Sequence, residues 1–218
     1  MIVEPRLVEY LNALEPELPE HLAALEAEAL AHEVPIIRKE AQSFLRFLLE
    51  LKQPKRILEI GTAIGFSASF FCEYMPEDCT LTTIEKVPMR IVEAEKNLAA
   101  IKRSKDVTLL KGDANDVLRR LAEAGNTYDF VFMDAAKGQY RSFLNELFPM
   151  LPPGALLVTD NVLQGGSIKE SKYSIVRRDR TIHMRMREYL YELKHDESFT
   201  TSIVPVGDGM ALCMRKWS

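Results

Sequence analysis

Residues 56–85 have the sequence RILEIGTAIGFSASFFCEYMPEDCTLTTIE. The short run RILEI is rich in aliphatic residues and predicts a strand. A turn with two glycines follows it, then the apolar helical stretch FSASFFCEYM and a second short run, TLTTIE. A strand, a helix and a strand in this order predict two parallel strands joined by a right-handed crossover.

The same alternation continues toward the C-terminus. Three more runs, VTLLKG (107–112), YDFVFMD (128–134) and ALLVTD (155–160), predict strands separated by helical stretches. A last helix is predicted from Ser171 to His195, and SIVPVGDG and MALCMRK after it predict a hairpin with its turn at residues 207–209. We therefore expect an α/β fold of the Rossmann-like class, with a mostly parallel seven-stranded sheet, an antiparallel C-terminal hairpin and helices on both faces.

The first 52 residues have a different texture. Apolar residues at three-to-four spacing predict helices over 7–14, over 19–33 and from about Pro35 to Lys52. With 218 residues, 47% of them hydrophobic, the chain can bury one sizeable core. We expect a single domain over 1–218, with a helical extension at 1–52 and the Rossmann-like core at 53–218.

Composition excludes several classes of protein. No apolar run approaches the roughly 20 residues that span a bilayer, and the acidic N-terminus lacks the features of a signal peptide. We therefore expect a cytoplasmic protein with no membrane partner. Cys72, Cys79 and Cys213 lack zinc-site spacing and are expected to be reduced thiols. The net charge is only −4, but residues 1–33 are rich in glutamate and residues 169–187 are rich in lysine and arginine.

Ligands of open α/β sheets bind beyond the carboxyl ends of the strands, and several residues there are candidates. Gly61 and Gly65 have G-x-x-x-G spacing, which suits a close approach to a ligand but equally a structural turn. Glu85 can accept hydrogen bonds from both hydroxyls of a ribose, or can be a solvated loop residue. Asp113 can cap the next helix, bind an adenine amine, or do both.

Two further strands end in Asp134 and in Asp160-Asn161. Each acid alone would more often be a helix cap. Together they form an oxygen-only set on adjacent strand ends, which suits Mg²⁺, Mn²⁺ or Ca²⁺ rather than zinc. A bound dication would also offset the cost of placing carboxylates at the edge of the core.

These residues lie within a recognisable set of motifs: LEIGTAIGFSA, IE, GDA, DAAKGQY, TDN and PVGDGMAL. The chain thereby resembles, over nearly its whole length, the cation-dependent class I O-methyltransferases, which use S-adenosylmethionine (SAM) and include the catechol and caffeoyl-CoA enzymes. The stretches HEVPI, KQPKRILEIGTAIG, FMDAAKGQY, VTDNVL and IVPVGDG are most similar to the bacterial tRNA 5-hydroxyuridine methyltransferases, which make 5-methoxyuridine at the wobble position.

The resemblance implies a set of site residues. It places the metal ligands, for Mg²⁺ or Mn²⁺, at Asp134, Asp160 and Asn161, and the SAM contacts at Ile37, Gly61, Ser67, Glu85, Asp113 and Asp134. Two positions depart from the relatives. Ala135 stands where the catechol enzymes have a histidine, and Ile37 stands where the close tRNA relatives tend to have methionine.

The motif also predicts how methyl transfer would proceed. The catalytic residues would be Asp134, which binds the dication, and Lys137, which acts as general base. The dication would lower the pKa of Lys137. Alternatively, Lys137 is an exposed lysine at a helix start. Arg177, Arg178 and Arg180 are expected to bind phosphates of a tRNA anticodon loop, unless they form an ordinary solvated helix face. A homodimer through the N-terminal helices is also expected.

Three alternatives to this function differ in the sequence features that they require. A small-molecule enzyme for catechols or hydroxycinnamoyl esters would have no need of the basic segment. A nicotinamide dehydrogenase is disfavoured because G-x-G-x-x-G is missing. A catalytically silent RNA-binding module would have no use for the two acids and Asn161 together.

Overall fold

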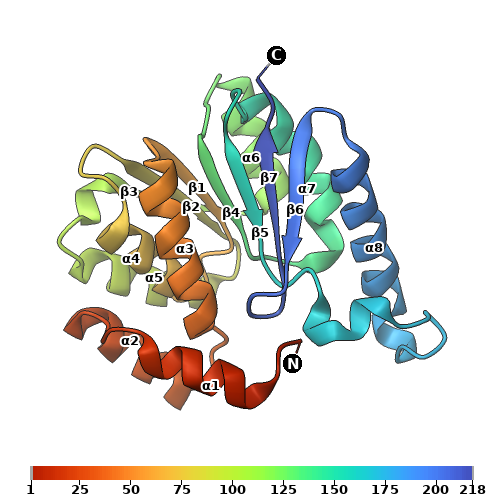
Figure 1. Cartoon of the computed structure of the whole chain (residues 1–218). Coiled ribbons are helices and arrows are strands. Elements are labelled where there is room, and N and C mark those ends of the chain that lie inside the picture. Colours follow the sequence, from red (N-terminus) through yellow and green to blue (C-terminus); the bar gives the residue numbers. More distant parts are fainter. Residues whose placement is uncertain (1, 218) are drawn as a thin grey trace.

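A computed structural model describes residues 2–217, and its centre is a seven-stranded sheet in the order β3-β2-β1-β4-β5-β7-β6. Strands β1 to β5 pair in parallel, and β7 pairs antiparallel with both β5 and β6 (Figure 1). The strands are β1 (Arg56–Ile60), β2 (Thr80–Glu85), β3 (Val107–Lys111), β4 (Phe130–Met133), β5 (Leu156–Thr159), β6 (Phe199–Val204) and β7 (Met210–Arg215). The predicted fold, including the C-terminal hairpin, is confirmed.

Helices cover both faces of this sheet (Figure 1). They are α1 (Pro5–Leu14), α2 (Glu20–Ala31), α3 (Lys39–Lys52), α4 (Phe66–Tyr74), α5 (Pro88–Ala100), α6 (Ala114–Glu123), α7 (Tyr140–Leu147) and α8 (Arg180–His195). Short 3₁₀ segments are η1 (Ser104–Asp106), η2 (Lys137–Gln139), η3 (Phe148–Met150), η4 (Gln164–Lys169) and η5 (Arg177–Asp179). None of the helices described is long and apolar enough to cross a membrane.

Alternating side chains of the strands build two separate cores. On β1, Ile57 packs with the apolar residues of α2 to α5, whereas Leu58 and Ile60 pack with those of α6, α7 and α8. This alternation follows from the two-residue period of a strand. Glu59 is two residues from Ile57, so its side chain lies on the same face of β1. It is fully buried, so β1 places a carboxylate on the face that packs with α2 to α5.

The N-terminal helices differ from the prediction at one boundary. Helix α3 begins at Lys39, not near Pro35, and residues 34–38 have no regular secondary structure. Arg38 has extended backbone, with φ −68° and ψ 158°, so the helix begins only at the next residue. The non-helical segment is important because Ile37, a predicted SAM contact, lies in it.

The last helix is shorter than predicted. Helix α8 begins at Arg180, and residues 171–179 form turns and the short segment η5. Arg180 donates from Nε to the carbonyl of Ile175 (3.0 Å) and from Nη2 to that of Tyr173 (3.3 Å). In a continuous helix these carbonyls would accept from backbone amides. Here the side chain of Arg180 donates to them instead and stabilises the turn at residues 173–175.

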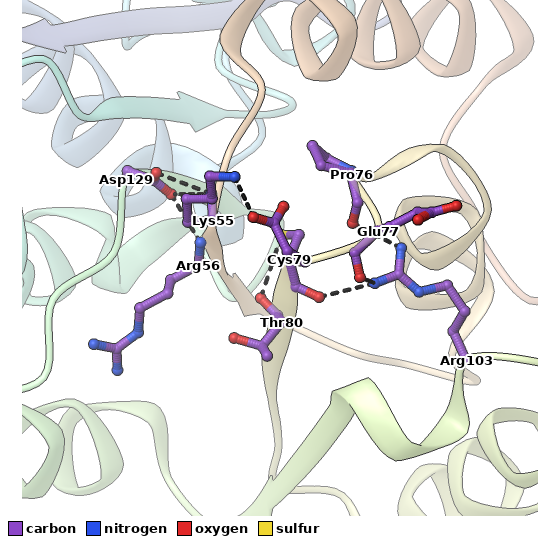
Figure 2. Close-up of polar contacts among 9 residues, drawn as sticks. Lys55, Arg56, Pro76, Glu77, Cys79, Thr80, Arg103 and Asp129 are labelled. Atoms are coloured by element: carbon purple, nitrogen blue, oxygen red, sulfur yellow. Dashed lines mark hydrogen bonds and ion pairs between the residues drawn. The ribbon is translucent and has the colours of Figure 1, made fainter.

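At the amino ends of the strands, charged side chains bond mainly to the backbone (Figure 2). Asp129 accepts hydrogen bonds from the amides of Lys55 and Arg56 at 3.0–3.1 Å. The guanidinium of Arg103 donates to the carbonyls of Met75, Pro76, Glu77 and Cys79 at 2.9–3.0 Å. Asp129 therefore ties the entry of β4 to that of β1, and Arg103 ties the segment before β3 to the loop that enters β2. The three cysteines are buried thiols.

Candidate functional site

The candidate site lies at the opposite end of the sheet, where the strand order reverses between β1 and β4. In open α/β sheets this is the place where a crevice forms beyond the strand ends. A cavity of about 620 Å³ lies there. Its lining includes every residue predicted for the cofactor, the metal and catalysis: Ile37, Gly61, Ser67, Glu85, Asp113, Asp134, Lys137, Asp160 and Asn161.

The glycine loop at residues 61–65 forms one wall of this cavity. Gly61 has φ +105°, and a Cβ atom there would lie 2.1 Å from the carbonyl oxygen of Asp134, so only glycine fits. The loop is fixed by Gly61 and Thr62, whose amides donate to the carbonyl of Ile84 (3.0 and 3.1 Å). The loop therefore presents its backbone to the cavity while it packs against β2 and β4.

Glu85 is a buried acid that anchors this loop, not a solvated glutamate. Its Oε2 accepts from the amide of Ala63 (2.9 Å), and its Oε1 accepts from the amides of Lys86 and Val87 (2.9 and 2.8 Å). Only 6% of the residue is exposed. A carboxylate has about four acceptor positions and three are occupied by these amides, so Glu85 retains one on Oε2 for a hydroxyl of a ribose.

Asp113 caps helix α6, as one of the two predicted roles requires. Its side chain accepts from the amide of Asn115 (3.0 Å) and lies 3.5 Å from Nζ of Lys86. Desolvation raises the pKa of Asp113, but the bonds from Asn115 and the charge of Lys86 outweigh it, and the net shift is downward. Asp113 is thus a charged acceptor beside the cavity.

Asp134, Asp160 and Asn161 are in contact at the carboxyl ends of β4 and β5. Asn161 donates from Nδ2 to Oδ1 of Asp134 (2.8 Å), and its amide donates to Oδ1 of Asp160 (2.6 Å). Asn161 has φ +61°, a conformation that is uncommon outside glycine. The three side chains expected on adjacent strand ends therefore do come together.

The two carboxylates of this group are held where charge is unfavourable. Burial raises the pKa of Asp160 to about 7, and the neighbouring charge of Asp134 adds to this shift. Burial also raises the pKa of Asp134, although the bond from Asn161 and the charge of Lys137 act against it. Two such acids and an amide oxygen suit a hard dication, which would stabilise both charges. The group contains only two acids, and in residues 2–217 no three His, Cys, Asp or Glu side chains gather at one point.

Lys137 is the first residue of η2 and lines the same cavity. Arg185 of α8 donates from Nη1 to the carbonyl of the next residue, Gly138 (3.1 Å). The backbone of Gln139 donates to that of Ala136 (2.8 Å). Lys137 is therefore carried by a short turn that is tied to α8, and it is only half-buried.

Three residues near the strand ends were not identified from the sequence, and one of them, Glu59, is fully buried and does not line the cavity. Glu59 carries a buried carboxylate whose Oε2 accepts from the hydroxyl of Thr83 (2.5 Å), and Thr83 contacts Thr62 of the glycine loop (2.5 Å). Its Oε1 has no hydrogen-bond partner among the residues described. Arg38 and Asp208 both line the cavity and form an ion pair of 3.0 Å. A carboxylate inside a strand that is otherwise apolar is a visible signal for Glu59, but no local pattern links residue 38 to residue 208.

The basic segment lies outside the cavity. Arg177 and Arg178 belong to η5 and are exposed, and Arg178 pairs with Asp179 at 3.5 Å. Arg180 is directed to carbonyls, as described above. Arg177 and Arg178 therefore lie outside the helix that was predicted to include them, because α8 begins only at Arg180.

Comparison with known proteins gives a consistent result. The profile of the O-methyltransferase family matches residues 11–216. A catechol O-methyltransferase from Niastella koreensis is 34% identical over 126 residues, which cover 57% of each chain, so the match spans little more than half of that relative. Caffeoyl-CoA O-methyltransferase 2 from Populus trichocarpa is 30% identical over 79% of this chain and 71% of its own length.

A solved structure supports the same relationship. The O-methyltransferase TomG from Streptomyces achromogenes, which is involved in tomaymycin synthesis, was determined in complex with SAM. It superposes with a TM-score of 0.84 and 25% identity, over 97% of this chain and 96% of its own.

Proposed function

This chain belongs to the O-methyltransferase family, and from that premise we propose that it transfers the methyl group of SAM to a hydroxyl oxygen of an acceptor that carries a second oxygen on the neighbouring carbon. One observation carries the proposal. A single cavity is lined by the glycine loop, by Glu85 and Asp113, and by the group Asp134, Asp160 and Asn161 with Lys137 beside it.

The cofactor would lie along the glycine loop. Gly61 allows close approach to the backbone, Ser67 offers a hydroxyl, Glu85 would bind a ribose hydroxyl and Asp113 the adenine amine. Ile37 is buried in the cavity wall and offers an apolar contact. These residues bind and orient SAM, which supplies an electrophilic methyl group on its sulfonium.

Asp134, Asp160 and Asn161 would hold a Mg²⁺ or Mn²⁺ ion. When bound, such an ion lowers the pKa of an acceptor hydroxyl and orients two neighbouring oxygens. The chain's own contribution is a fixed set of oxygen ligands at a site where burial raises the pKa of both acids.

Lys137 would act as general base in this reaction. Its side-chain nitrogen would take the proton from the acceptor hydroxyl while an oxygen electron pair forms the new bond to the methyl carbon. The bond from that carbon to sulfur breaks, and S-adenosylhomocysteine leaves. Arg185 supports this role because it holds the carbonyl of Gly138 and so fixes the turn that carries Lys137.

The test of this proposal compares catechol with phenol as acceptors of labelled methyl groups. We expect transfer to catechol, none to phenol, and loss of transfer in excess EDTA with recovery on Mg²⁺ or Mn²⁺. Transfer to catechol that persists in EDTA would contradict the metal site, and equal transfer to phenol would contradict the requirement for two oxygens.

A second candidate acceptor is 5-hydroxyuridine at the wobble position of tRNA, whose hydroxyl also lies next to a carbonyl oxygen. The names of the two relatives above favour small phenols, but one observation favours RNA. Tyr173, Arg177 and Arg178 are exposed on the segment that leads into α8, the helix that contacts the Lys137 turn. Exposed aromatic and basic side chains suit unstacked bases and phosphates.

The two acceptors can be separated directly. The protein is incubated with labelled SAM and total tRNA from a strain without the endogenous activity, in parallel with catechol. Replacing both Arg177 and Arg178 by Ala should weaken tRNA binding and flatten its salt dependence by somewhat under one log unit per lost contact, without affecting catechol. No incorporation into tRNA would leave the small phenol as the acceptor.

We also propose that the protein forms a homodimer through its N-terminal helices. Helix α1 buries no side chain of its own and exposes Leu7, Tyr10, Leu11 and Leu14, while α3 exposes Phe47 and Leu51. Exposed apolar side chains on these N-terminal helices suit a protein interface. Sedimentation of the full chain should give a dimer and that of Leu14→Glu a monomer; a monomeric wild type would refute the proposal.

A further inference from the structure

The ion pair of Arg38 and Asp208 joins two parts of the cavity wall that are 170 residues apart in the sequence. Arg38 donates from Nη2 to Oδ2 of Asp208 at 3.0 Å, and both side chains line the cavity. Their side chains are 43% and 24% exposed. An ion pair this exposed generally contributes little to the free energy of unfolding, so a role other than stabilising the fold is considered for it.

On one side the pair is attached to the segment expected to contact the cofactor. Arg38 directly follows Ile37, whose carbonyl accepts from Nε2 of the buried Gln42 (3.0 Å). The same amide group donates to Glu26 of α2 (3.0 Å). Residues 37 and 38 are therefore held against α3 and α2, and Arg38 extends this support to the C-terminal hairpin.

On the other side the pair is attached to the residues that follow Asn161. The carbonyl of Asp208 accepts from the amide of Leu163 (3.0 Å), and that of Gly209 accepts from the amide of Val162 (2.9 Å). Gly209 has φ +90°, and a Cβ atom there would lie 2.3 Å from Leu163. The hairpin turn is thus packed tightly on the loop that begins with Asn161.

We propose that Arg38 and Asp208 are positioning residues that couple cofactor binding to metal binding. When the cofactor binds against residues 37–38, the ion pair holds the hairpin turn in place, and the turn holds Val162 and Leu163 and so the backbone of Asn161. The proposal rests on the proposed function, because it assumes that the cavity binds both SAM and a dication. Coupling between two binding sites is reciprocal, so each ligand must tighten the other by the same factor.

The experiment measures binding and needs no turnover. The affinity of the full chain for Mn²⁺ is measured by titration with and without saturating S-adenosylhomocysteine, and the affinity for S-adenosylhomocysteine is measured with and without Mn²⁺. We expect each ligand to tighten the other by roughly fivefold or more in the wild type. In Arg38→Gln and in Asp208→Asn this factor should fall toward one, and the double variant should lose no more than either single variant.

Two controls make the result specific. Arg119→Gln removes a comparably exposed ion-pair partner, 3.4 Å from Glu146, that does not line the cavity, and it should keep the wild-type factor. The exchange of Arg38→Asp with Asp208→Arg restores a pair of opposite charges and should recover part of the factor. A thermal melt of each variant should stay close to that of the wild type.

The possible failures are distinguishable. If the wild type binds neither ligand, the proposed function fails and the coupling fails with it. If both ligands bind but the factor is one in the wild type, or is unchanged in Arg38→Gln and Asp208→Asn, only the coupling is refuted. If Arg38→Gln weakens S-adenosylhomocysteine equally with and without Mn²⁺, Arg38 is a direct ligand contact and the coupling is likewise refuted.

Discussion

Charged side chains have different surroundings at the two ends of the parallel sheet. At the amino ends, Asp129 accepts three hydrogen bonds from the backbone amides of Lys55 and Arg56, and Arg103 donates to four carbonyls, of which Figure 2 shows those of Pro76, Glu77 and Cys79. At the carboxyl ends, Asp134 and Asp160 lie side by side in a cavity, and Glu59 keeps one oxygen without a hydrogen-bond partner among the residues described.

This difference separates charges that hold the fold from charges that serve a ligand. A charge bonded fully to the backbone is satisfied in the free protein, so it has little left to offer a ligand. Buried acids with raised pKa values are unfavourable in the free protein and gain most when a cation or a donor arrives. The comparison predicts that substitutions at one end change stability alone and that those at the other end change function first.

The largest effect is expected for the acid pair. Asp160→Asn keeps the shape of the side chain but removes a negative charge from the proposed metal site, so methyl transfer should fall by at least about 1,000-fold. The melting temperature without metal should not fall, because a buried like charge has been removed beside Asp134. Initial rates and thermal melts of the two proteins check both statements. If Asp160→Asn keeps the wild-type rate, Asp160 is not required for methyl transfer and its role is structural.

The next effect concerns Lys137. Lys137→Met retains the aliphatic stem but cannot take a proton, and turnover should fall by about 100- to 10,000-fold. Affinity for S-adenosylhomocysteine should stay the same, because the amine acts only in the transition state. Arg141→Met, a few residues further along, is the matched control, since Arg141 pairs with Glu192 at 2.6 Å and does not line the large cavity. Wild-type turnover in Lys137→Met would exclude it as the base.

Sequence patterns were sufficient for most of the fold and for the residues at the strand ends. A buried parallel strand needs a run of apolar residues, and its carboxyl end is marked where that run stops at Glu85, Asp134 or Asp160. Because parallel strands end at one edge, the sequence alone could bring these acids together. A turn at Gly61 was predictable from its place after the first strand, but its close contact with the carbonyl of Asp134 is visible only in the structure.

Contacts between distant segments could not be predicted in this way. The pair of Arg38 and Asp208 depends on how the C-terminal hairpin packs on the start of α3, which no local pattern describes. The start of α8 was predicted too early because residues 171–179 are compatible with a helix by spacing. Their turn is held instead by Arg180, whose bonds to the carbonyls of Tyr173 and Ile175 are visible only in three dimensions.

A smaller effect, on stability alone, is expected at the amino ends of the strands. Arg103→Ala removes donors from the carbonyls of Met75, Pro76, Glu77 and Cys79 and a partner from Asp106, so the free energy of unfolding should fall by about 3–4 kcal/mol. Methyl transfer per folded molecule should be unchanged. Denaturant unfolding and initial rates measure the two quantities. A loss of rate without a loss of stability would contradict the proposal that substitutions at this end change stability alone.

The smallest effect is a dependence of stability on pH that arises from Glu59. Burial raises the pKa of this carboxyl from 4.5 to about 7, and the nearby hydroxyls of Ser67 and Thr83 only partly offset the shift. The folded protein therefore binds the proton of Glu59 more tightly than the unfolded chain does. Stability from this group is fully present below about pH 4.5, and it is lost as the pH rises through about 7.

Glu59→Gln isolates this contribution, because glutamine imitates the protonated acid and can still accept from Thr83. Above pH 7 the variant should be more stable than the wild type by about 2–3 kcal/mol, and the difference should shrink toward zero near pH 4.5. Both proteins are unfolded by denaturant in EDTA between pH 4.5 and 8, so that any change from the acids at residues 134 and 160 is common to both. A constant difference across this range would mean that Glu59 is ionised throughout and that its charge is satisfied in the free protein, as the charge of Asp129 is at the other end of the sheet.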